Sequence, residues 1–294
     1  MRLIYADSDL HIPYEGDKNN YNFCISRERQ IEVAILEYAR PKNHDRLYEI
    51  IENPENIKNS SIECFLRTTI DFYNRFDHNA INAINNRSIK HRVEYWLSNM
   101  PKDFRKDFLK RNMITTTLGD FLENEKLRKM FENDKGQIFA KTIQKEHGFA
   151  NCAPFEDMEE EISYCSAKSG NDRIVMLSEP LDFGQEYRTF VWDNFPICSS
   201  TYDDYKMIRV PDSVQEFIKN AVMNVAMKME FPKFYTIDVA ETDRGLVIVE
   251  FNDFGLSGRY IGNDFCQMVE AMFGITIDKP YEEFVKEFDK KNIT

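Results

Sequence analysis

The feature that most constrains this chain is a pair of apolar segments, between residues 235 and 252, that carry three oxygen-bearing side chains. Their pattern predicts two β-strands joined by a turn at residues 243–245. Asp238 lies on the first strand, and Glu250 and Asn252 lie on the second. Side chains two positions apart on a strand share a face, so Glu250 and Asn252 point the same way. If the strands pair about the turn, Asp238 comes alongside them.

Two carboxylates and one amide oxygen on one face suit a hard divalent cation such as Mg²⁺. Mg²⁺ takes few protein ligands and commonly completes its shell with substrate phosphates. Charged groups inside such apolar strands are more often engaged than idle, because an isolated charge in an apolar layer is costly. The alternative is an ordinary amphipathic hairpin with a solvated acidic face. The pattern favours a magnesium site and leaves that alternative open.

Length and composition describe a chain with a substantial core. Its 294 residues suffice for one large domain or two to three small ones, and 42% of them are hydrophobic. No apolar run approaches the roughly 20 residues of a membrane helix, and the N-terminal apolar stretch is too short for a signal peptide. The six cysteines form no CxxC pair, which argues against a zinc site and for reduced thiols. We therefore expect a soluble, cytoplasmic protein with no membrane partner.

The charge balance argues against a general nucleic-acid binder. A net charge of -12 and a pI of about 5.1 disfavour binding through a broad basic surface. The densest basic stretch, residues 102–111, is predicted to be a solvated helix face above packed Phe104 and Phe108.

Helical and strand patterns mix without strict alternation, which predicts an α+β fold more than a doubly wound sheet. The helical patterns fall at residues 26–39, 46–52, 61–74, 88–99, 103–110, 118–131, 157–167, 213–229, 263–273 and 281–290. Besides the hairpin described above, strand patterns fall at residues 3–5, 137–141, 173–177, 186–192 and 195–200. A domain boundary is expected near residue 85.

Four segments occur in an order that is informative as a set. A strand ends in a lysine at Ile138-Phe-Ala-Lys141, and an apolar strand leads to a glutamate at residues 174–179. A strand with a Glu-x-Arg pattern follows at residues 185–191, and a helix then leads to the acidic hairpin. Over about residues 86–275 this order resembles the ATP-grasp superfamily, whose members mostly join a carboxylate to an amine, using ATP through an acyl-phosphate.

The resemblance implies an ATP-grasp fold, in which two α+β subdomains clasp ATP. The small subdomain is expected at residues 86–175 and the large one at residues 176–294. A smaller N-terminal domain, residues 1–85, would precede them.

The resemblance also implies how ATP and Mg²⁺ are held, with Asp238, Glu250 and Asn252 as the metal ligands. Lys141 is expected to reach the α- and β-phosphates as a point charge. Backbone groups of Val175 and Leu177 would meet the adenine edge. Glu179 and Glu186 are expected at the adenine amino group or the ribose hydroxyls. The alternative for Lys141 is a surface lysine at the end of a strand. The alternative for Glu179 and Glu186 is that they are carboxylates on the rim of the site.

Three further basic residues are candidates by the same resemblance. The planar guanidinium of Arg188 suits the oxygens of an acyl-phosphate or a carboxylate, with a structural ion pair as the alternative. Lys90 matches the position of a first nucleotide lysine, with a helix-surface lysine as the alternative. Arg259 follows a turn that contains Gly255 and Gly258, and it is expected to face the acceptor substrate.

The implied activity is a ligase that uses ATP and Mg²⁺ to join a carboxylate to an amine. The segment after Lys141, residues 144–148, holds one glycine where many relatives have a glycine- and serine-rich phosphate loop, and its His147 is expected to be solvated. Two alternatives keep the fold: a kinase-like phosphotransferase, and a non-catalytic interaction protein that binds ATP. A nucleic-acid modifying enzyme would need a basic groove, which the overall acidity does not indicate.

Overall fold

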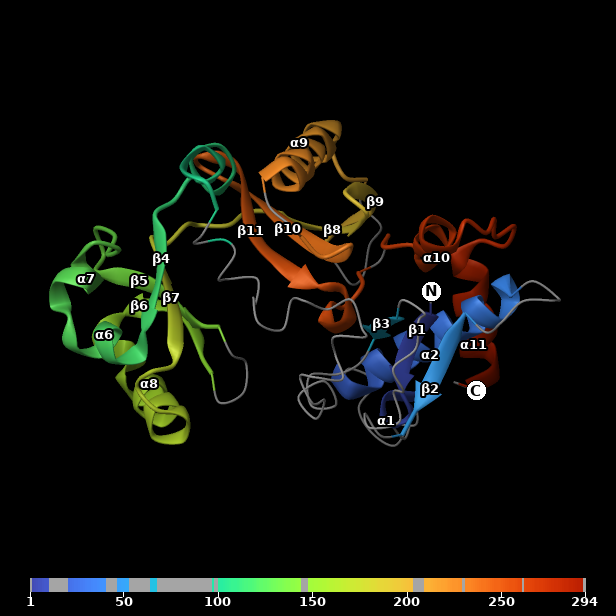
Figure 1. The fold of residues 1–294 in the computed structure, drawn as a ribbon, viewed down its shortest axis with the longest axis horizontal. Coiled ribbons are helices and arrows are strands. Elements are labelled where there is room, and N and C mark those ends of the chain that lie inside the picture. The colour runs from blue at the N-terminus through green and yellow to red at the C-terminus, as the bar shows by residue number, and fades with distance from the viewer. Residues whose placement is uncertain are drawn as a thin grey trace. The chain divides into compact units, whose positions relative to one another are not determined.

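The computed structural model describes residues 2–10, 21–40, 47–52, 64–67, 97, 100–143, 148–202, 209–228, 231–260 and 262–292 (Figure 1). Helices and sheets both contribute, which confirms the predicted α+β class. The chain forms two compact units. Unit 1 comprises Met1–Ile89, Tyr187–Thr236 and Asn252–Thr294, and unit 2 comprises Lys90–Glu186 and Ile237–Phe251. The predicted domains, residues 1–85, 86–175 and 176–294, are continuous stretches of sequence, whereas each compact unit combines separate stretches. The domain boundaries therefore stay a prediction.

A three-stranded parallel sheet lies in unit 1. The central strand β1 (Arg2–Ala6) pairs with β2 (Tyr48–Ile51) on one side and with β3 (Cys64–Arg67) on the other. The predictions of helices at residues 46–52 and 61–74 were therefore wrong where the structure describes them. Each strand has four residues, and its pairing partner β1 is distant in the sequence, so local periodicity gave no strand signal.

Helices cover this sheet and complete the core of unit 1. α2 (Tyr21–Ala39) confirms the helix predicted at residues 26–39 but begins five residues earlier. Ile31 and Ile35 of α2 are buried in one cluster with Leu3 and Tyr5 of β1. The same cluster includes side chains of α10 (Phe265–Phe273) and α11 (Tyr281–Asn292), which confirm the last two predicted helices. A short helix, α1 (Asp7–Leu10), follows β1.

A buried ion network links α2, β3 and the segment after residue 253 inside unit 1. Glu32, which is 0% exposed, accepts from Arg67 at 2.8 Å and from Arg259 at 2.9 Å. Arg29 donates to Glu32 at 3.2 Å, and Glu28 accepts from Arg67 and Arg259. Burial alone would raise the pKa of Glu32, but Arg67, Arg29 and Arg259 together hold that pKa well below its usual range.

Replacing Glu32 with glutamine is expected to destabilise the protein by about 3 kcal/mol at pH 7, because three buried arginines lose their shared anion. The folded-state pKa of Glu32 is lowered, so its contribution is full above its ordinary value of 4.5 and is lost as the pH falls below it. Urea unfolding at pH 7 and pH 3.5 should therefore show less acid destabilisation in the variant. Glu49→Gln, at an exposed carboxylate 3.9 Å from Arg2, is the control. Equal pH dependence in Glu32→Gln and wild type would contradict this.

Unit 2 is built on a four-stranded antiparallel sheet with the order β4-β7-β5-β6. Its strands are β4 (Met113–Thr117), β5 (Gln137–Thr142), β6 (Ala150–Pro154) and β7 (Ile174–Ser178). β5 and β7 confirm predicted strands, whereas β4 and β6 were not predicted. Side chains of β5 and β7 form a buried cluster with those of α6 (Leu118–Glu123) and α8 (Phe155–Ser169).

The helix predicted at residues 118–131 is interrupted. The α6 helix ends before Asn124, whose side chain accepts from Leu127 N and caps α7 (Glu125–Lys129). The helix predicted near 103–110 is present as α5 (Lys102–Phe104) followed by the π-helical turn η4 (Arg105–Leu109). Phe104 and Phe108 are buried, with ring centroids 4.7 Å apart, which confirms the predicted packing. The helix predicted at residues 88–99 lies almost entirely outside the described residues.

Two hairpins supply the third sheet, whose strand order is β11-β10-β8-β9. β8 (Glu186–Trp192) and β9 (Phe195–Thr201) meet at Asp193 and Asn194, whose φ values of 47° and 66° suit a tight hairpin turn. β10 (Phe234–Thr242) and β11 (Gly245–Asp253) form the predicted acidic hairpin. α9 (Asp212–Lys228) precedes β10 as predicted. In the described part of the chain, every helix is too short or too polar to cross a membrane.

Candidate active site

The predicted metal ligands lie on adjacent strands of the acidic hairpin. Asp238 is in the middle of β10 and is 0% exposed, while Glu250 and Asn252 on β11 are half-buried. Phe251, between the two ligands, is buried, as expected for a side chain that points into the opposite layer. Because Asp238 is fully buried, it is not part of a solvated acidic face, and its role as a metal ligand stays a prediction.

Unit 2 brings the predicted phosphate lysine to a predicted metal ligand. The Lys141 Nζ donates to Glu250 Oε2 at 2.7 Å, although 109 positions separate the two residues. Their side chains are 18% and 23% exposed, so the pair is shielded from bulk water but not sealed. Lys141 therefore does not point away from the molecule as an isolated surface lysine would. An ammonium and a carboxylate side by side suit a ligand that carries both phosphate charge and a bound cation.

The predicted adenine segment is an interior strand of the sheet in unit 2. Val175 is paired with Thr116 of β4 and with Thr142 of β5, and Leu177 is paired on both sides in the same way. Both side chains are 0% exposed. β7 is thus an interior strand, and at Val175 and Leu177 both of its edges are occupied by neighbouring strands. Contact of Val175 or Leu177 with a nucleotide stays a prediction.

The two glutamates predicted near the nucleoside lie just after β7 and at the start of β8. The Glu179 carboxylate accepts from the Asn112 side chain and, at 3.0 Å, from Arg244 on the turn of the acidic hairpin. These contacts hold Glu179 beside the hairpin that carries Glu250, all within unit 2. Glu186 opens β8 and is half-buried. The nucleoside roles of both carboxylates stay predictions.

Arg188, predicted to contact the acyl-phosphate, lies in unit 1 on β8 and is 8% exposed. Its guanidinium donates to Gly258 O at 3.1 Å and to the Tyr202 hydroxyl at 2.5 Å. The same group lies 5.0 Å from the ring centroid of Tyr202 and 5.3 Å from that of Tyr260. Two aromatic faces and two hydrogen bonds orient the guanidinium plane. Sequence reasoning missed both tyrosines, because neither belongs to a motif.

Arg259, predicted to face the acceptor, has a nearly buried side chain, 3% exposed. Its Nε donates to Glu28 and Glu32 of the ion network, and its guanidinium also lies 5.0 Å from the Tyr281 ring. Burial would lower the pKa of Arg259, but Tyr281, Glu28 and Glu32 outweigh that effect and raise it. These contacts give Arg259 a structural role in unit 1, and substrate contact at this position stays a prediction.

Sequence reasoning did not identify a further arginine that lies next to the acidic hairpin. Arg111 donates to Ile248 O at 2.8 Å and to Val249 O at 2.9 Å, directly before Glu250. Burial lowers the pKa of Arg111 to about 10, with the Glu250 carboxylate opposing this effect, so the guanidinium stays protonated at neutral pH. The basic stretch that contains Arg111 was interpreted as a solvated helix face, which is why its last member went unnoticed.

The donor set fits Mg²⁺ better than a soft metal. Among the described residues, no three His, Cys, Asp or Glu side chains form a group that would hold a metal ion. The predicted set has two carboxylates and one amide, few enough for Mg²⁺ that shares its shell with phosphates. Two further predictions lie outside the described residues: Lys90, and the segment 144–147 with His147.

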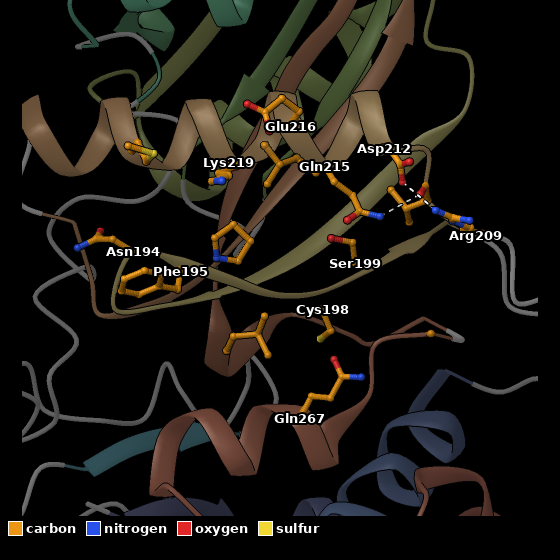
Figure 2. Close-up of a pocket in the computed structure, with 16 residues that line it drawn as sticks. Asn194, Phe195, Cys198, Ser199, Arg209, Asp212, Gln215, Glu216, Lys219 and Gln267 are labelled. Carbon is orange, nitrogen blue, oxygen red and sulfur yellow. Dashed lines mark hydrogen bonds and ion pairs between the residues drawn. The ribbon is translucent and has the colours of Figure 1, made fainter.

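A separate pocket of about 960 Å³ lies in unit 1 between β9, α9 and the start of α10 (Figure 2). None of the predicted site residues lines it. Four of its lining residues bind each other: Gln215 donates to Val210 O, and Arg209 pairs with Asp212 at 3.0 Å. Both charges of that pair are more than four-fifths exposed, and the other charged lining residues, Glu216 and Lys219, are exposed as well, so this pocket has no buried charge to select a ligand.

A comparison with protein-family models and one with solved structures both find similarity to ATP-grasp proteins. A family model described as ATP-grasp domain, R2K clade family 3, matches residues 81–273. No curated protein matches the chain. Among solved structures, D-alanyl-alanine synthetase A from Vibrio cholerae O1 biovar eltor str. N16961 is similar, with a TM-score of 0.54 and 12% identity over 99% of this chain and 98% of that one.

Two other solved structures are similar over most of their length. D-cycloserine synthetase DcsG has a TM-score of 0.56 and 9% identity over 99% of both chains. The ATP-grasp ligase PsnB, complexed with a phosphomimetic variant of a minimal precursor, Mg and ADP, has a TM-score of 0.52 and 14% identity. That match covers 92% of this chain and 96% of PsnB. At these identities the likeness concerns the fold alone.

Proposed function

Because the chain belongs to the ATP-grasp domain family, R2K clade family 3, we propose that it is a ligase that uses ATP and Mg²⁺ to join a carboxylate to an amine. The observation that supports the proposal is the 2.7 Å contact between Lys141 Nζ and Glu250 Oε2, because an ammonium beside a carboxylate suits a ligand that brings both phosphates and Mg²⁺. PsnB is an ATP-grasp ligase described with Mg and ADP, and the other two named structures are synthetases, which supports an adenine nucleotide and Mg²⁺ here.

The proposed reaction has two steps. An oxygen of the substrate carboxylate attacks the γ-phosphorus of ATP, the bond to the β-γ bridging oxygen breaks, and ADP leaves. The amine then attacks the acyl carbon, inorganic phosphate leaves, and the nitrogen loses a proton to solvent. Each step is a displacement, so positioning and charge stabilisation are the main tasks of the protein.

The residues divide these tasks. Lys141 binds the phosphates, and Arg188, oriented by Tyr202, neutralises the oxygens of the reacting acid and its phosphate. Asp238, Glu250 and Asn252 would hold Mg²⁺, which supplies charge neutralisation between the phosphates. Glu179 and Glu186 are proposed at the nucleoside. By analogy with the precursor of PsnB and the alanine of the synthetase, we propose amino acids or peptides as the substrates to screen.

The test is whether phosphate release requires both an acid and an amine. Purified protein with ATP and Mg²⁺ is given pools of amino acids and peptides, and ADP, phosphate and coupled product are measured. Hydroxylamine in place of the amine should trap the activated acid as a hydroxamate. A stable phosphorylated product that forms without any amine would favour the phosphotransferase. Nucleotide binding without turnover over the whole screen would favour the interaction protein.

Replacing Lys141 with methionine is expected to weaken ATP binding about 10- to 100-fold, because a charge-assisted contact to phosphate contributes about 1.5–3 kcal/mol. Titration with a fluorescent ATP analogue measures the dissociation constant. Lys129→Met is the matched control, since Lys129 also pairs with a carboxylate, Glu125 at 2.6 Å, but is 63% exposed. If Lys141→Met and Lys129→Met bind the analogue equally well, Lys141 is not a nucleotide ligand.

A further inference from the structure

Asn263 is a buried amide that joins two strands of unit 1 beside Arg188. The residue is 1% exposed. Its Nδ2 donates to Arg188 O at 3.3 Å, and its Oδ1 accepts from Ser200 Oγ at 2.7 Å. Arg188 on β8 and Ser200 on β9 are directly paired in the sheet. The Asn263 side chain therefore binds both members of the residue pair that carries the guanidinium.

The same amide holds the loop that carries Gly258, Tyr260 and Gly262. Asn263 Oδ1 also accepts from Tyr260 N at 3.1 Å, and Asn263 N donates to Tyr260 O at 2.9 Å. The Tyr260 ring centroid lies 5.3 Å from the Arg188 guanidinium, and Gly258 O accepts from Arg188 Nη1 at 3.1 Å. Two of the groups that orient this guanidinium therefore belong to a loop whose backbone is bound by Asn263.

Gly262 allows the loop to approach β9 closely. Its φ of 105° lies in a region that favours glycine over residues with a side chain. A Cβ at this position would lie 3.3 Å from Ser200 Cβ and 3.9 Å from Ser199 O. The loop backbone thus packs against β9 at Ser200, the residue whose hydroxyl binds Asn263.

Asn263 is itself well supported, because it directly precedes a core helix. Asp264 is the N-cap of α10, and its side chain accepts from Cys266 N at 2.8 Å. Phe265, the first residue of α10, is 0% exposed in the core of unit 1. Asn263 O also accepts from Arg259 Nη1 at 3.2 Å, which connects the loop to the buried ion network. A residue held by packed neighbours in this way can fix the geometry of a site.

We propose that Asn263 is a positioning residue for Arg188. It holds the loop of Gly258 and Tyr260 against β8 and β9, and so fixes the direction in which the guanidinium points. The proposal rests on the proposed function of Arg188 at the reacting acid. An amide suits this task because its oxygen accepts two hydrogen bonds while its nitrogen donates one. A carboxylate of the same shape could not donate to Arg188 O.

The first test follows the Arg188 guanidinium by NMR in protein labelled with isotopic arginine. It measures the rate of rotation about the Nε–Cζ bond, and the Arg188 signals are identified by their loss in Arg188→Ala. Rotation should be slow in the wild type, because Gly258 O and the Tyr202 hydroxyl bind the two Nη groups. Asn263→Ala is expected to speed the rotation about 10-fold, which corresponds to the loss of about one hydrogen bond.

Asn133 in unit 2 provides a matched control, because its amide makes the same three kinds of contact. Its Oδ1 accepts from Lys135 N at 2.9 Å and from Gln137 N at 3.0 Å, and its Nδ2 donates to Gln137 Oε1 at 3.1 Å. Asn133→Ala should keep the wild-type rotation rate of Arg188. Equal acceleration in Asn133→Ala and Asn263→Ala would overturn the proposal, because the loss of any such amide would then suffice.

The second test measures hydroxamate formation with ATP, Mg²⁺, hydroxylamine and the pool of amino acids. Asn263→Ala is expected to lower this rate about 10- to 100-fold, since a misplaced catalytic group costs rate. The dissociation constant of an ATP analogue should stay that of the wild type. In an Arg188→Ala background, Asn263→Ala should cause no further loss, because it acts through Arg188. A further loss as large as in the wild-type background would contradict the positioning role.

The remaining outcomes separate the two proposals. If Asn263→Ala speeds the rotation but leaves hydroxamate formation unchanged, the positioning role stands and the proposed function of Arg188 is wrong. If a folded Asn263→Ala keeps the wild-type rotation rate, the positioning role is wrong. If Asn263→Ala does not fold, Ser200→Ala decides, because it removes the 2.7 Å contact with the Asn263 amide. Wild-type rotation in Ser200→Ala would then refute the positioning role, and faster rotation would support it.

Discussion

Replacing Glu250 with alanine is expected to lower ATP turnover by about 10³-fold, which corresponds to about 4 kcal/mol of lost transition-state stabilisation. Glu250 is the half-buried carboxylate that meets Lys141 at 2.7 Å, and in the proposed function it would be one of the residues that hold Mg²⁺. Its removal deprives that cation of a ligand and leaves Lys141 without this partner. ADP formation at saturating ATP and Mg²⁺ measures the effect.

The fold should survive this substitution, because the Lys141 and Glu250 side chains both remain accessible to water. The circular dichroism spectrum and unfolding midpoint should therefore stay close to those of the wild type. Glu241→Ala is the control, since Glu241 lies on the same hairpin but is exposed. Full activity of Glu250→Ala would refute the metal site, and partial recovery at high Mg²⁺ in Glu250→Gln would support it.

Replacing Arg188 with alanine is expected to spare nucleotide binding but to lower product formation by about 10²- to 10³-fold, the usual effect of losing one group that stabilises developing charge. Its guanidinium is oriented by Tyr202, Tyr260 and Gly258 O, so it needs little reorganisation when charge develops on the acyl-phosphate. The two readouts are the dissociation constant of an ATP analogue and the rate of coupled product formation.

The alternative for Arg188 is a purely structural arginine, and a matched variant separates the two. Arg27 also lies in unit 1 and binds Asp289 through two hydrogen bonds of 2.9 and 2.7 Å. Arg27→Ala should change the unfolding midpoint without changing the turnover number. If Arg188→Ala behaves like Arg27→Ala, with an unchanged turnover number, Arg188 does not belong to the site.

Elements with a local signal were predicted well. The β8–β9 hairpin follows from Asp193 and Asn194, because both residue types tolerate the left-handed backbone that a tight hairpin turn requires. The strands of the acidic hairpin follow from apolar runs on both sides of a turn that contains Gly245. By contrast, β2 and β3 were mistaken for helices, because their pairing partner β1 is distant in the sequence.

The candidate site divides in the same way. Asp238, Glu250 and Asn252 stood out because polar side chains in apolar strands are rare enough to notice. Tyr202 and Tyr260 carried no such signal, although both rings lie beside the Arg188 guanidinium. Arg111 resembled its basic neighbours, and only the contacts of its side chain separate it from them.

What the sequence determined by itself is the α+β class, and it also predicted the kind of chemistry: oxygen ligands for a hard cation and a lysine for phosphate. These follow from residue type and local period, which need no partner elsewhere in the chain. Tertiary structure alone decided which groups meet, as with Lys141 and Glu250, 109 positions apart. It also decided which charges became structural, as with Arg259 in the ion network. The physical reason is that contact and burial depend on how distant segments pack against each other, and a local sequence pattern contains no information about that packing.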